Sequence, residues 1–138
     1  MDPLKAASAS AYSGLAAQSM RMRITAENIS NAESTGSTAG ADPYRRKTVS
    51  FAQELDNLSG ANVVRVSEVG VDPSPFVVEY QPGHPAADDK GNVKMPNVNM
   101  IVEMTDMRMA ARSYEANLQV IRQGREMSAS LVDLLRST

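Results

Sequence analysis

Polar and apolar residues follow one pattern at the two ends of the chain and another pattern between them. In residues 3–31 and 99–135, apolar side chains recur at alternating steps of three and four, which is the period of an amphipathic helix. Between these segments, short valine-rich runs are separated by proline, glycine and asparagine, as in strands and turns. The pattern predicts a mainly α fold with a small β insert. Long N- and C-terminal helices would pack as a coiled-coil-like pair beside a small antiparallel β-rich middle region.

This interpretation divides the chain into three parts. Residues 1–36 form the N-terminal helix, which is half of a helical domain; residues 37–96 form the β-rich middle region; and residues 97–138 form the C-terminal helix, which is the other half. Within the middle region, we expect strands at residues 45–51, 62–69, 75–80 and 93–95. About fifty residues make a marginal core on their own, so we expect this region to pack against the helices or neighbouring subunits.

Local signals mark where each helix starts. The Asp2 carboxylate can accept a first-turn N–H, and Pro3 at the first helical position loses no hydrogen bond. This helix should end between residues 31 and 36, where Asn, Ser, Thr and Gly accumulate. Asn99 is the expected N-cap of the second helix. Glu103 follows it in the first turn, where the helix macrodipole favours acidic side chains.

The apolar seams of both helices predict an assembly interface. The middle region is too small to cover a face of this length, so we expect two partners: the other terminal helix and a neighbouring subunit. Gly14 would permit a close approach of one helix, and amides beside the seams would fix helix register. The predicted interface residues are Leu4, Ala11, Leu15, Met22, Asn28, Ile29, Asn31, Met104, Met107, Ala111, Tyr114, Asn117, Leu118, Ile121, Met127, Leu131 and Leu134.

Composition removes several function classes. The chain has 138 residues, a formal net charge of −2 and no cysteine, so disulfides and thiolate sites are excluded. The acidic balance argues against nucleic acid as a partner, because affinity for the phosphate backbone comes largely from Lys and Arg. The one basic run, Arg45 to Lys47 beside Tyr44, is better explained as a solvated strand edge or a subunit salt-bridge patch. Without an apolar leader or a membrane-length apolar stretch, we expect a cytoplasmic protein or one exported without a cleaved signal peptide.

The residues that could carry out chemistry are few. His84, the only histidine, lies between two prolines and just before Asp88 and Asp89. We interpret this segment as a rigid turn in which histidine bonds the backbone, rather than as a metal site. No glycine-rich phosphate loop, no HExxH motif and no Gly-x-Ser-x-Gly motif is present. We therefore predict no enzyme activity, no cofactor, no metal and no small-molecule substrate. An enzyme would need a pocket built from His84, Asp88, Asp89 and perhaps Tyr80, and a second alternative is a cytoplasmic helical adaptor that grips a partner helix.

Two motifs resemble those of bacterial flagellar rod and hook axial proteins. Residues 24–32, ITAENISNA, followed by Thr35 and Gly36, are similar to the N-terminal signature of that family. Glu103 and Met104, with residues 112–117, RSYEAN, are similar to its C-terminal counterpart. A third segment resembles the proximal-rod members in particular, and its turn residues are Pro82, Gly83, His84, Pro85, Pro96 and Asn97.

The resemblance implies a structural subunit of the flagellar basal-body rod. It implies export in an unfolded state through the flagellar type III apparatus and assembly in the periplasmic space. The implied partners are copies of the same chain, other proximal-rod proteins, the distal-rod protein and the membrane-embedded basal ring. Another rod or hook subunit remains an alternative. Subunits that contact one another head to tail would form an open helical tube.

Overall fold

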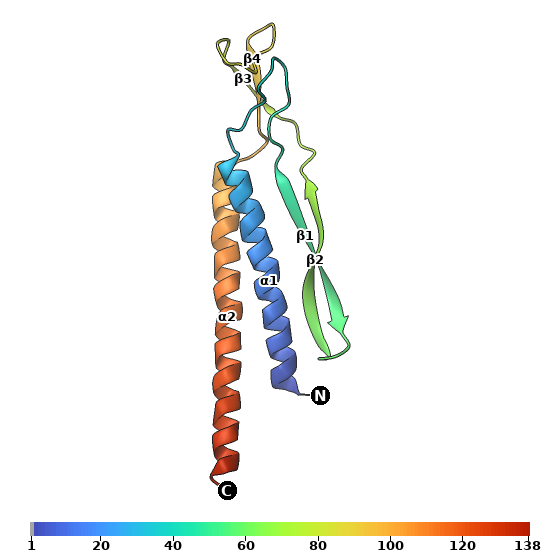
Figure 1. Ribbon diagram of the computed structural model, residues 1–138, viewed down its shortest axis with the longest axis vertical. Coiled ribbons are helices and arrows are strands. Elements are labelled where there is room, and N and C mark those ends of the chain that lie inside the picture. Colours follow the sequence, from blue (N-terminus) through green and yellow to red (C-terminus); the bar gives the residue numbers. More distant parts are fainter. Residues whose placement is uncertain (1) are drawn as a thin grey trace. The chain divides into compact units, whose positions relative to one another are not determined.

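The computed structural model describes residues 2–138 and has two long helices and four strands (Figure 1). The predicted fold class is confirmed, with a helix at each end and small antiparallel sheets between them. In chain order, the elements are α1 (Pro3–Ser30), β1 (Lys47–Asp56), β2 (Ala61–Val71), β3 (Val77–Tyr80), β4 (Asn92–Met95) and α2 (Met100–Arg136).

The helix starts follow from the predicted caps. Leu4 N–H donates to Asp2 Oδ1 at 3.0 Å, and Ile101 N–H donates to Asn99 Oδ1 at 3.0 Å. Each cap satisfies an N–H that has no partner inside its helix. The first helix ends at Ser30, just before the polar segment where its end was expected.

The strands of the expected antiparallel β-rich region form two separate sheets of two strands each. β1 pairs with β2, and β3 pairs antiparallel with β4, with Val77 opposite Met95 and Tyr80 opposite Asn92. Pro73 and Pro75 lie between β2 and β3. Proline cannot donate to a ladder, so this linker separates the two sheets.

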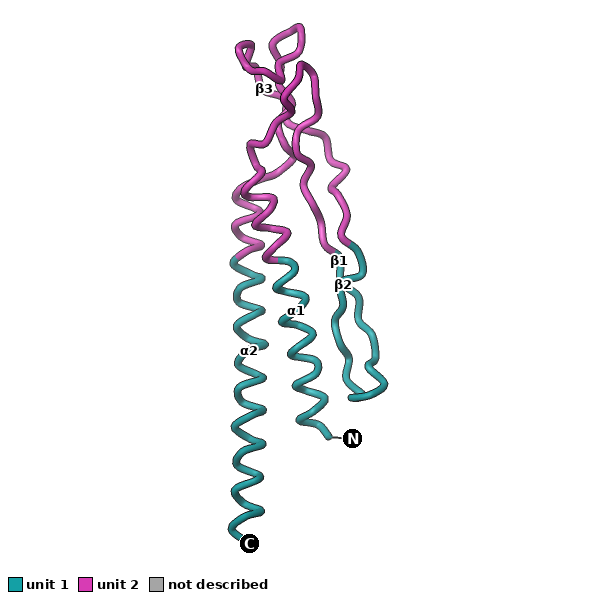
Figure 2. Tube along the Cα trace, in the orientation of Figure 1, with its two compact units in different colours: residues 1–21, 50–68, 108–138 teal, residues 22–49, 69–107 magenta. Residues whose placement is uncertain are grey.

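The chain divides into two compact units (Figure 2). Unit 1 consists of residues up to 21, 50–68 and 108–138, and unit 2 consists of residues 22–49 and 69–107. Both helices and the first hairpin contribute to each unit. None of the helices in the described part of the chain is both long and apolar enough to cross a membrane.

In unit 1, α1 is covered on two faces. Ala11 is buried, and an added Cβ at Gly14 would lie 2.6 Å from the Asn117 side-chain nitrogen, so α2 approaches this face closely. On another face, Ser13 Oγ accepts the N–H of Val64 on β2 at 3.0 Å. The close approach expected at Gly14 is confirmed. Two covered faces also explain why apolar positions spread around α1.

Unit 2 has a small core around the second hairpin. Val93 on β4 and Ala86 in the preceding turn are fully buried, and Ile24 of α1 is also buried. Gly91 has a φ of +83°, and a Cβ there would lie 2.8 Å from the Tyr80 ring. A glycine is therefore required at the turn before β4.

Candidate assembly site

A buried amide lies at the end of α1 in unit 2. Asn28 is 1% exposed, and its side-chain nitrogen donates to Lys47 O at 2.9 Å and to Glu103 Oε2 at 3.2 Å. Its side-chain oxygen accepts from Lys47 N–H at 2.9 Å and from Tyr44 O–H at 2.7 Å. All four hydrogen-bonding positions of the amide are thus used inside the chain, and they join α1 to the start of β1 and to α2.

Arg46 binds the same carboxylate from another side. Its guanidinium donates to Glu103 Oε1, which belongs to a residue only 1% exposed, and to Asp72 Oδ2 at 3.4 Å. An ion pair with Asp106 of α2 follows at 3.8 Å. The backbone N–H of Arg46 donates to Asn97 Oδ1 at 2.8 Å. We name Asn28, Arg46, Asp72, Asn97 and Glu103 the polar cluster.

The charges of the polar cluster stabilise one another. Burial opposes the charge of Arg46, but the hydrogen bond and attraction of Glu103, with a smaller contribution from Asp72, raise the pKa of Arg46 above its usual value. The Ser74 hydroxyl and N–H, helped by Arg46, lower the pKa of Asp72. A cluster in which Arg46 binds Glu103 and Asp72 within the chain is suited to holding elements in place.

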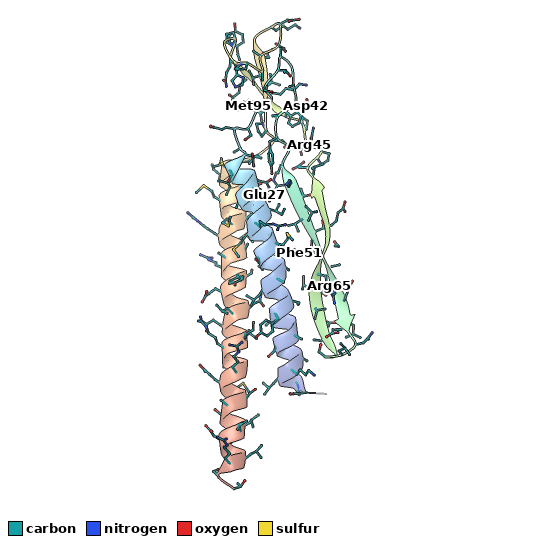
Figure 3. All side chains as sticks on the ribbon, viewed as in Figure 1. Glu27, Asp42, Arg45, Phe51, Arg65 and Met95 are labelled. Atoms are coloured by element: carbon teal, nitrogen blue, oxygen red, sulfur yellow. The ribbon has the colours of Figure 1, made fainter. Side chains whose placement is uncertain are left out.

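The basic run is also held by the chain itself. Lys47 Nζ lies 2.8 Å from Glu27 Oε2, and Arg45 lies over the Phe76 ring at 4.2 Å from its centroid. Arg45 also donates to the backbone oxygens of Asp72 and Ser74. Figure 3 labels Glu27 on α1 and Arg45 just before β1. These contacts leave little of the run available for a phosphate backbone.

The turn around His84 is built from backbone contacts. His84 Nδ1 accepts the N–H of Ala86 at 3.0 Å, so the other ring nitrogen carries the proton and lies 3.4 Å from Thr35 Oγ1. Asp88 Oδ1 accepts the N–H groups of Lys90 and Asn92, each at 2.9 Å. Within residues 2–138, no three His, Asp or Glu side chains are grouped to hold a metal. His84 therefore bonds the backbone, as expected for a rigid turn.

The predicted interface residues on α1 and α2 differ in exposure. On α1, Ala11 and Asn28 are buried, and Leu4, Leu15, Met22, Ile29 and the following Asn31 are half-buried. On α2, Ile121 is buried, Met107, Tyr114, Asn117 and Leu118 are half-buried, and Met104, Ala111, Met127, Leu131 and Leu134 are exposed. The amides of Asn31 and Asn117 donate to backbone oxygens one helical turn earlier.

The less exposed face of α2 has its own regular spacing and includes the predicted interface residues Met107, Tyr114, Asn117 and Ile121. The residues of this face recur at alternating steps of four and three. They are Glu103, Met107, Ala110, Tyr114, Asn117, Ile121 and Gly124. Sequence reasoning missed Glu103 and Ala110 because it followed the larger apolar side chains. The pairing of Glu103 with Arg46 had no local signal, since 57 positions separate the two residues.

The last two turns of α2 are exposed in the described part of the chain. A surface depression lined by Asp2, Leu4 and Ser128 places the first turn of α1 beside this part of α2. Every residue after Ser128 is exposed. We name residues 129–136 the α2 tip, which is ~12 Å long at 1.5 Å per residue. Its large apolar side chains, between 51% and 78% exposed, are Leu131, Val132, Leu134 and Leu135.

Comparison with known proteins gives one consistent family. Residues 89–134 match the family described as "Flagellar basal body rod FlgEFG protein C-terminal". The flagellar basal-body rod protein FlgC of Agrobacterium fabrum is 63% identical over 138 residues, which cover all of this chain and 99% of that protein. FlgC of Borreliella burgdorferi is 38% identical over 91% of this chain and 93% of that protein. FlgC of Escherichia coli O157:H7 is 39% identical over 90% of this chain and 92% of that protein.

Proposed function

Because this chain belongs to the FlgC family of flagellar basal-body rod proteins and is a structural subunit of the rod, we propose that it forms part of the proximal rod. In this proposal, the terminal helices join subunits into a helical tube that transmits motor torque. A subunit that contacts its neighbours through two different surfaces generates an open helical assembly rather than a closed ring or dimer.

The observation that carries this proposal is the exposed α2 tip. Burying a leucine side chain completely contributes about 1.5–3 kcal/mol, and Leu131, Leu134 and Leu135 are all at least half exposed. Apolar side chains gathered at an exposed helix end form the kind of surface that a contact with another protein buries. Contacts with neighbouring subunits would bury it and would contribute strongly to assembly.

The proposed partners are the components that surround such a subunit. They are copies of this chain, other proximal-rod proteins, the distal-rod protein and the membrane-embedded basal ring. Export through the flagellar type III apparatus, without a cleaved signal peptide, would deliver the chain to the periplasmic space. A chain without cysteine requires no disulfide to fold there.

A mechanical role needs no catalysis, and the absence of enzyme activity, cofactor and small-molecule substrate stays a prediction. The hydrogen bonds of His84 to its own turn support a structural role for this histidine. A cytoplasmic adaptor would be folded and soluble as a monomer or small oligomer, so the location of the protein in the cell separates the two functions.

The test is deletion of residues 131–138, which removes most of the α2 tip. We expect the shortened chain to be made and secreted but to be absent from isolated basal bodies, with loss of motility. Deletion of residues 137–138 alone is the matched control, since both lie after the end of α2, and it should leave incorporation normal. Normal recovery of the 131–138 deletion in basal bodies would contradict a role for this end in assembly.

A further inference from the structure

The linker between β2 and β3 has little burial to hold it in place. It consists of residues 72–76, between Val71 at the end of β2 and Val77 at the start of β3. Asp72 and Phe76 are half-buried, and the three residues between them are exposed. Segments with few buried contacts are ordinarily mobile, so hydrogen bonds must decide whether this linker is fixed.

Two prolines restrict the linker from within. The rings of Pro73 and Pro75 lock φ at their own positions, and each ring keeps the residue before it out of the helical region. Among the torsions that remain free are ψ of Asp72 and ψ of Ser74. Each of these torsions sets the direction of the carbonyl of its own residue. Any group that fixes the two carbonyls therefore restrains the path of the linker.

Both carbonyls are held by the same two donors, Arg45 and Asn97. Arg45 Nη1 donates to Asp72 O at 2.9 Å and to Ser74 O at 3.1 Å. Asn97 Nδ2 donates to the same two oxygens at 3.0 Å and 3.1 Å. Each donor nitrogen carries two hydrogens and each carbonyl has two lone pairs, so the four bonds use the full capacity of these groups. We name Arg45, Asn97 and the two carbonyls the linker clamp.

The groups of the linker clamp are themselves held by other bonds. Asn97 Oδ1 accepts the N–H of Arg46 at 2.8 Å, so the nitrogen end of this amide is directed to the linker. The Arg45 guanidinium lies 4.2 Å from the centroid of the Phe76 ring. The N–H of Asp72 donates to Arg46 O at 2.8 Å and anchors the start of the linker. The linker clamp thus joins the linker to fixed points in unit 2.

The linker clamp lies at the open end of the second hairpin. The β3–β4 pairing begins with Val77 opposite Met95, and Asn97 follows Met95 by two residues. Through Asn97, the segment that leaves β4 is bonded to the linker that enters β3. All four residues of β3 are exposed, so packing on this strand contributes little to the position of the hairpin. Its direction depends on the bonds at its open end.

We propose that Arg45 and Asn97 are positioning residues that hold the β3–β4 hairpin in one direction relative to the rest of unit 2. The hairpin is then a rigid projection of the subunit rather than an arm that swings about the linker. This inference concerns the conformation of the chain itself and does not depend on the rod function. A projection of fixed direction also suits a subunit that transmits torque.

The distance between two spin labels tests the linker clamp directly, because the chain contains no cysteine of its own. Val69→Cys places one label on β2, and Lys90→Cys places the other in the turn before β4, at the end of the hairpin away from the linker. Both positions are exposed and belong to unit 2. Pulsed electron spin resonance on the full-length chain in solution should give one narrow distance distribution.

The test variant is Asn97→Asp, made in the doubly labelled chain. It keeps an acceptor for the N–H of Arg46 but removes the donor and turns a carboxylate to the two linker carbonyls. We expect the width of the distance distribution to increase at least twofold. Arg45→Gln tests the other donor with the same expectation, and it replaces Asn97→Asp if circular dichroism shows that Asn97→Asp does not fold.

The matched control is Arg65→Gln, which removes an ion pair with Glu54 in unit 1 and should leave the width unchanged. A distribution that is equally broad in the original chain would overturn the linker clamp, as would equal broadening by the control. A width that either test variant leaves unchanged would overturn the role of that residue. These results would leave the rod function intact, whereas absence of the original chain from isolated basal bodies would contradict the rod function alone.

Discussion

The side-chain nitrogen of Asn28, at the end of α1, donates a hydrogen bond to the carboxylate of Glu103, in the first turn of α2, at 3.2 Å. Both residues are 1% exposed, although one is a carboxylate and the other an amide. Such burial requires that every polar atom find a partner, and Lys47, Tyr44 and Arg46 supply them. A buried polar contact thus joins the two helices in unit 2.

Replacing Glu103 by Ala should strongly destabilise the protein. The change leaves Arg46 without its most buried partner and removes one acceptor of Asn28, and breaking a buried ion pair on one side costs about 3–5 kcal/mol. Because the Arg46 side chain is 23% exposed, water can compensate in part, so we expect the lower end of this range. Urea unfolding of the purified protein followed by circular dichroism measures the difference.

Glu103→Gln is the matched variant, since it keeps the shape and one acceptor but removes the charge. Its destabilisation should be smaller than that of Glu103→Ala. If both variants unfold at the same urea concentration as the original protein, the polar cluster does not hold unit 2 together.

The ion pair between Lys47 and Glu27 should make the stability of the folded protein depend on pH, in acidic as well as in alkaline solution. The hydrogen bond between Lys47 and Glu27 lowers the pKa of Glu27 and raises that of Lys47. The contribution of Glu27 is present above its unfolded pKa of about 4.3 and is lost as pH falls through its lower folded value. The contribution of Lys47 is present below its unfolded pKa of about 10.4 and is lost as pH rises through its higher folded value.

Thermal unfolding between pH 3 and pH 11 tests this relation, with Glu27→Gln as the variant. The original protein should have a plateau between roughly pH 5 and pH 10 and a falling Tm on either side. Glu27→Gln should weaken the fall on the alkaline side as well as on the acidic side, because it removes the partner of Lys47. If Glu27→Gln changes the Tm only at acidic pH, the ion pair does not contribute to the fall in Tm at alkaline pH.

The sequence predicted the parts of this fold that are encoded locally. The caps at Asp2 and Asn99 each depend on a few neighbouring residues, and the structure has both of them. The buried face of α2 was harder to predict because it contains Glu103, which apolar periodicity excludes. Glu103 can be buried because it pairs with Arg46. Arg46 lies far from Glu103 in the sequence, so the two residues meet only when the chain folds.

The candidate site was predictable to a different extent. Asn28 was recognised as an amide beside a seam, but its partners Tyr44 and Lys47 could not be inferred, since they follow an irregular segment. A groove between α1 and β2 in unit 1 was not predicted. Its helix wall, formed by Ala9, Ser13, Ala16 and Met20, has the spacing of a seam, but it consists mostly of small side chains, and seams are recognised by large ones.

Charges placed in the helix seams should prevent assembly. Leu15→Asp and Leu118→Asp each remove a half-buried apolar side chain and put a carboxylate in its place, at a cost of about 2 kcal/mol or more. We expect loss of motility in soft agar and absence of both variants from isolated basal bodies. His84→Ala should have a milder and local effect, because it removes one hydrogen bond within its own turn and one contact with Thr35.

Leu58→Asp is the matched control for the stability of these variants, since Leu58 is 93% exposed at the tip of the first hairpin. Its Tm should lie within a few degrees of the original.

Complete loss of function in His84→Ala with normal assembly, restored by a divalent metal in a suitable variant, would contradict the structural role of the turn.

Two glycines within helices should respond to alanine in opposite directions. Glycine costs about 1 kcal/mol relative to alanine inside a helix, so each substitution begins with a similar gain. At Gly124 the new Cβ would lie 3.5 Å from Ser8 Oγ, an ordinary contact, and Gly124→Ala should stabilise by up to about 1 kcal/mol. At Gly14 the Cβ would lie 2.6 Å from Asn117 Nδ2 and 2.9 Å from Asn117 Cγ.

Relief of that clash requires Asn117 to rotate away from Gly14 and to lose its hydrogen bond to Ser113 O, or the helices to separate. Overpacking costs typically about 1–3 kcal/mol, and the lost bond adds about 1 kcal/mol, so Gly14→Ala should be destabilising despite its helix propensity. Urea unfolding of the two variants, both in unit 1, measures the contrast. Gly14→Ala combined with Asn117→Ala should recover most of the stability, because the shortened side chain leaves room for the new methyl group; a double variant no more stable than Gly14→Ala would show that the helix backbones, rather than Asn117, set the limit.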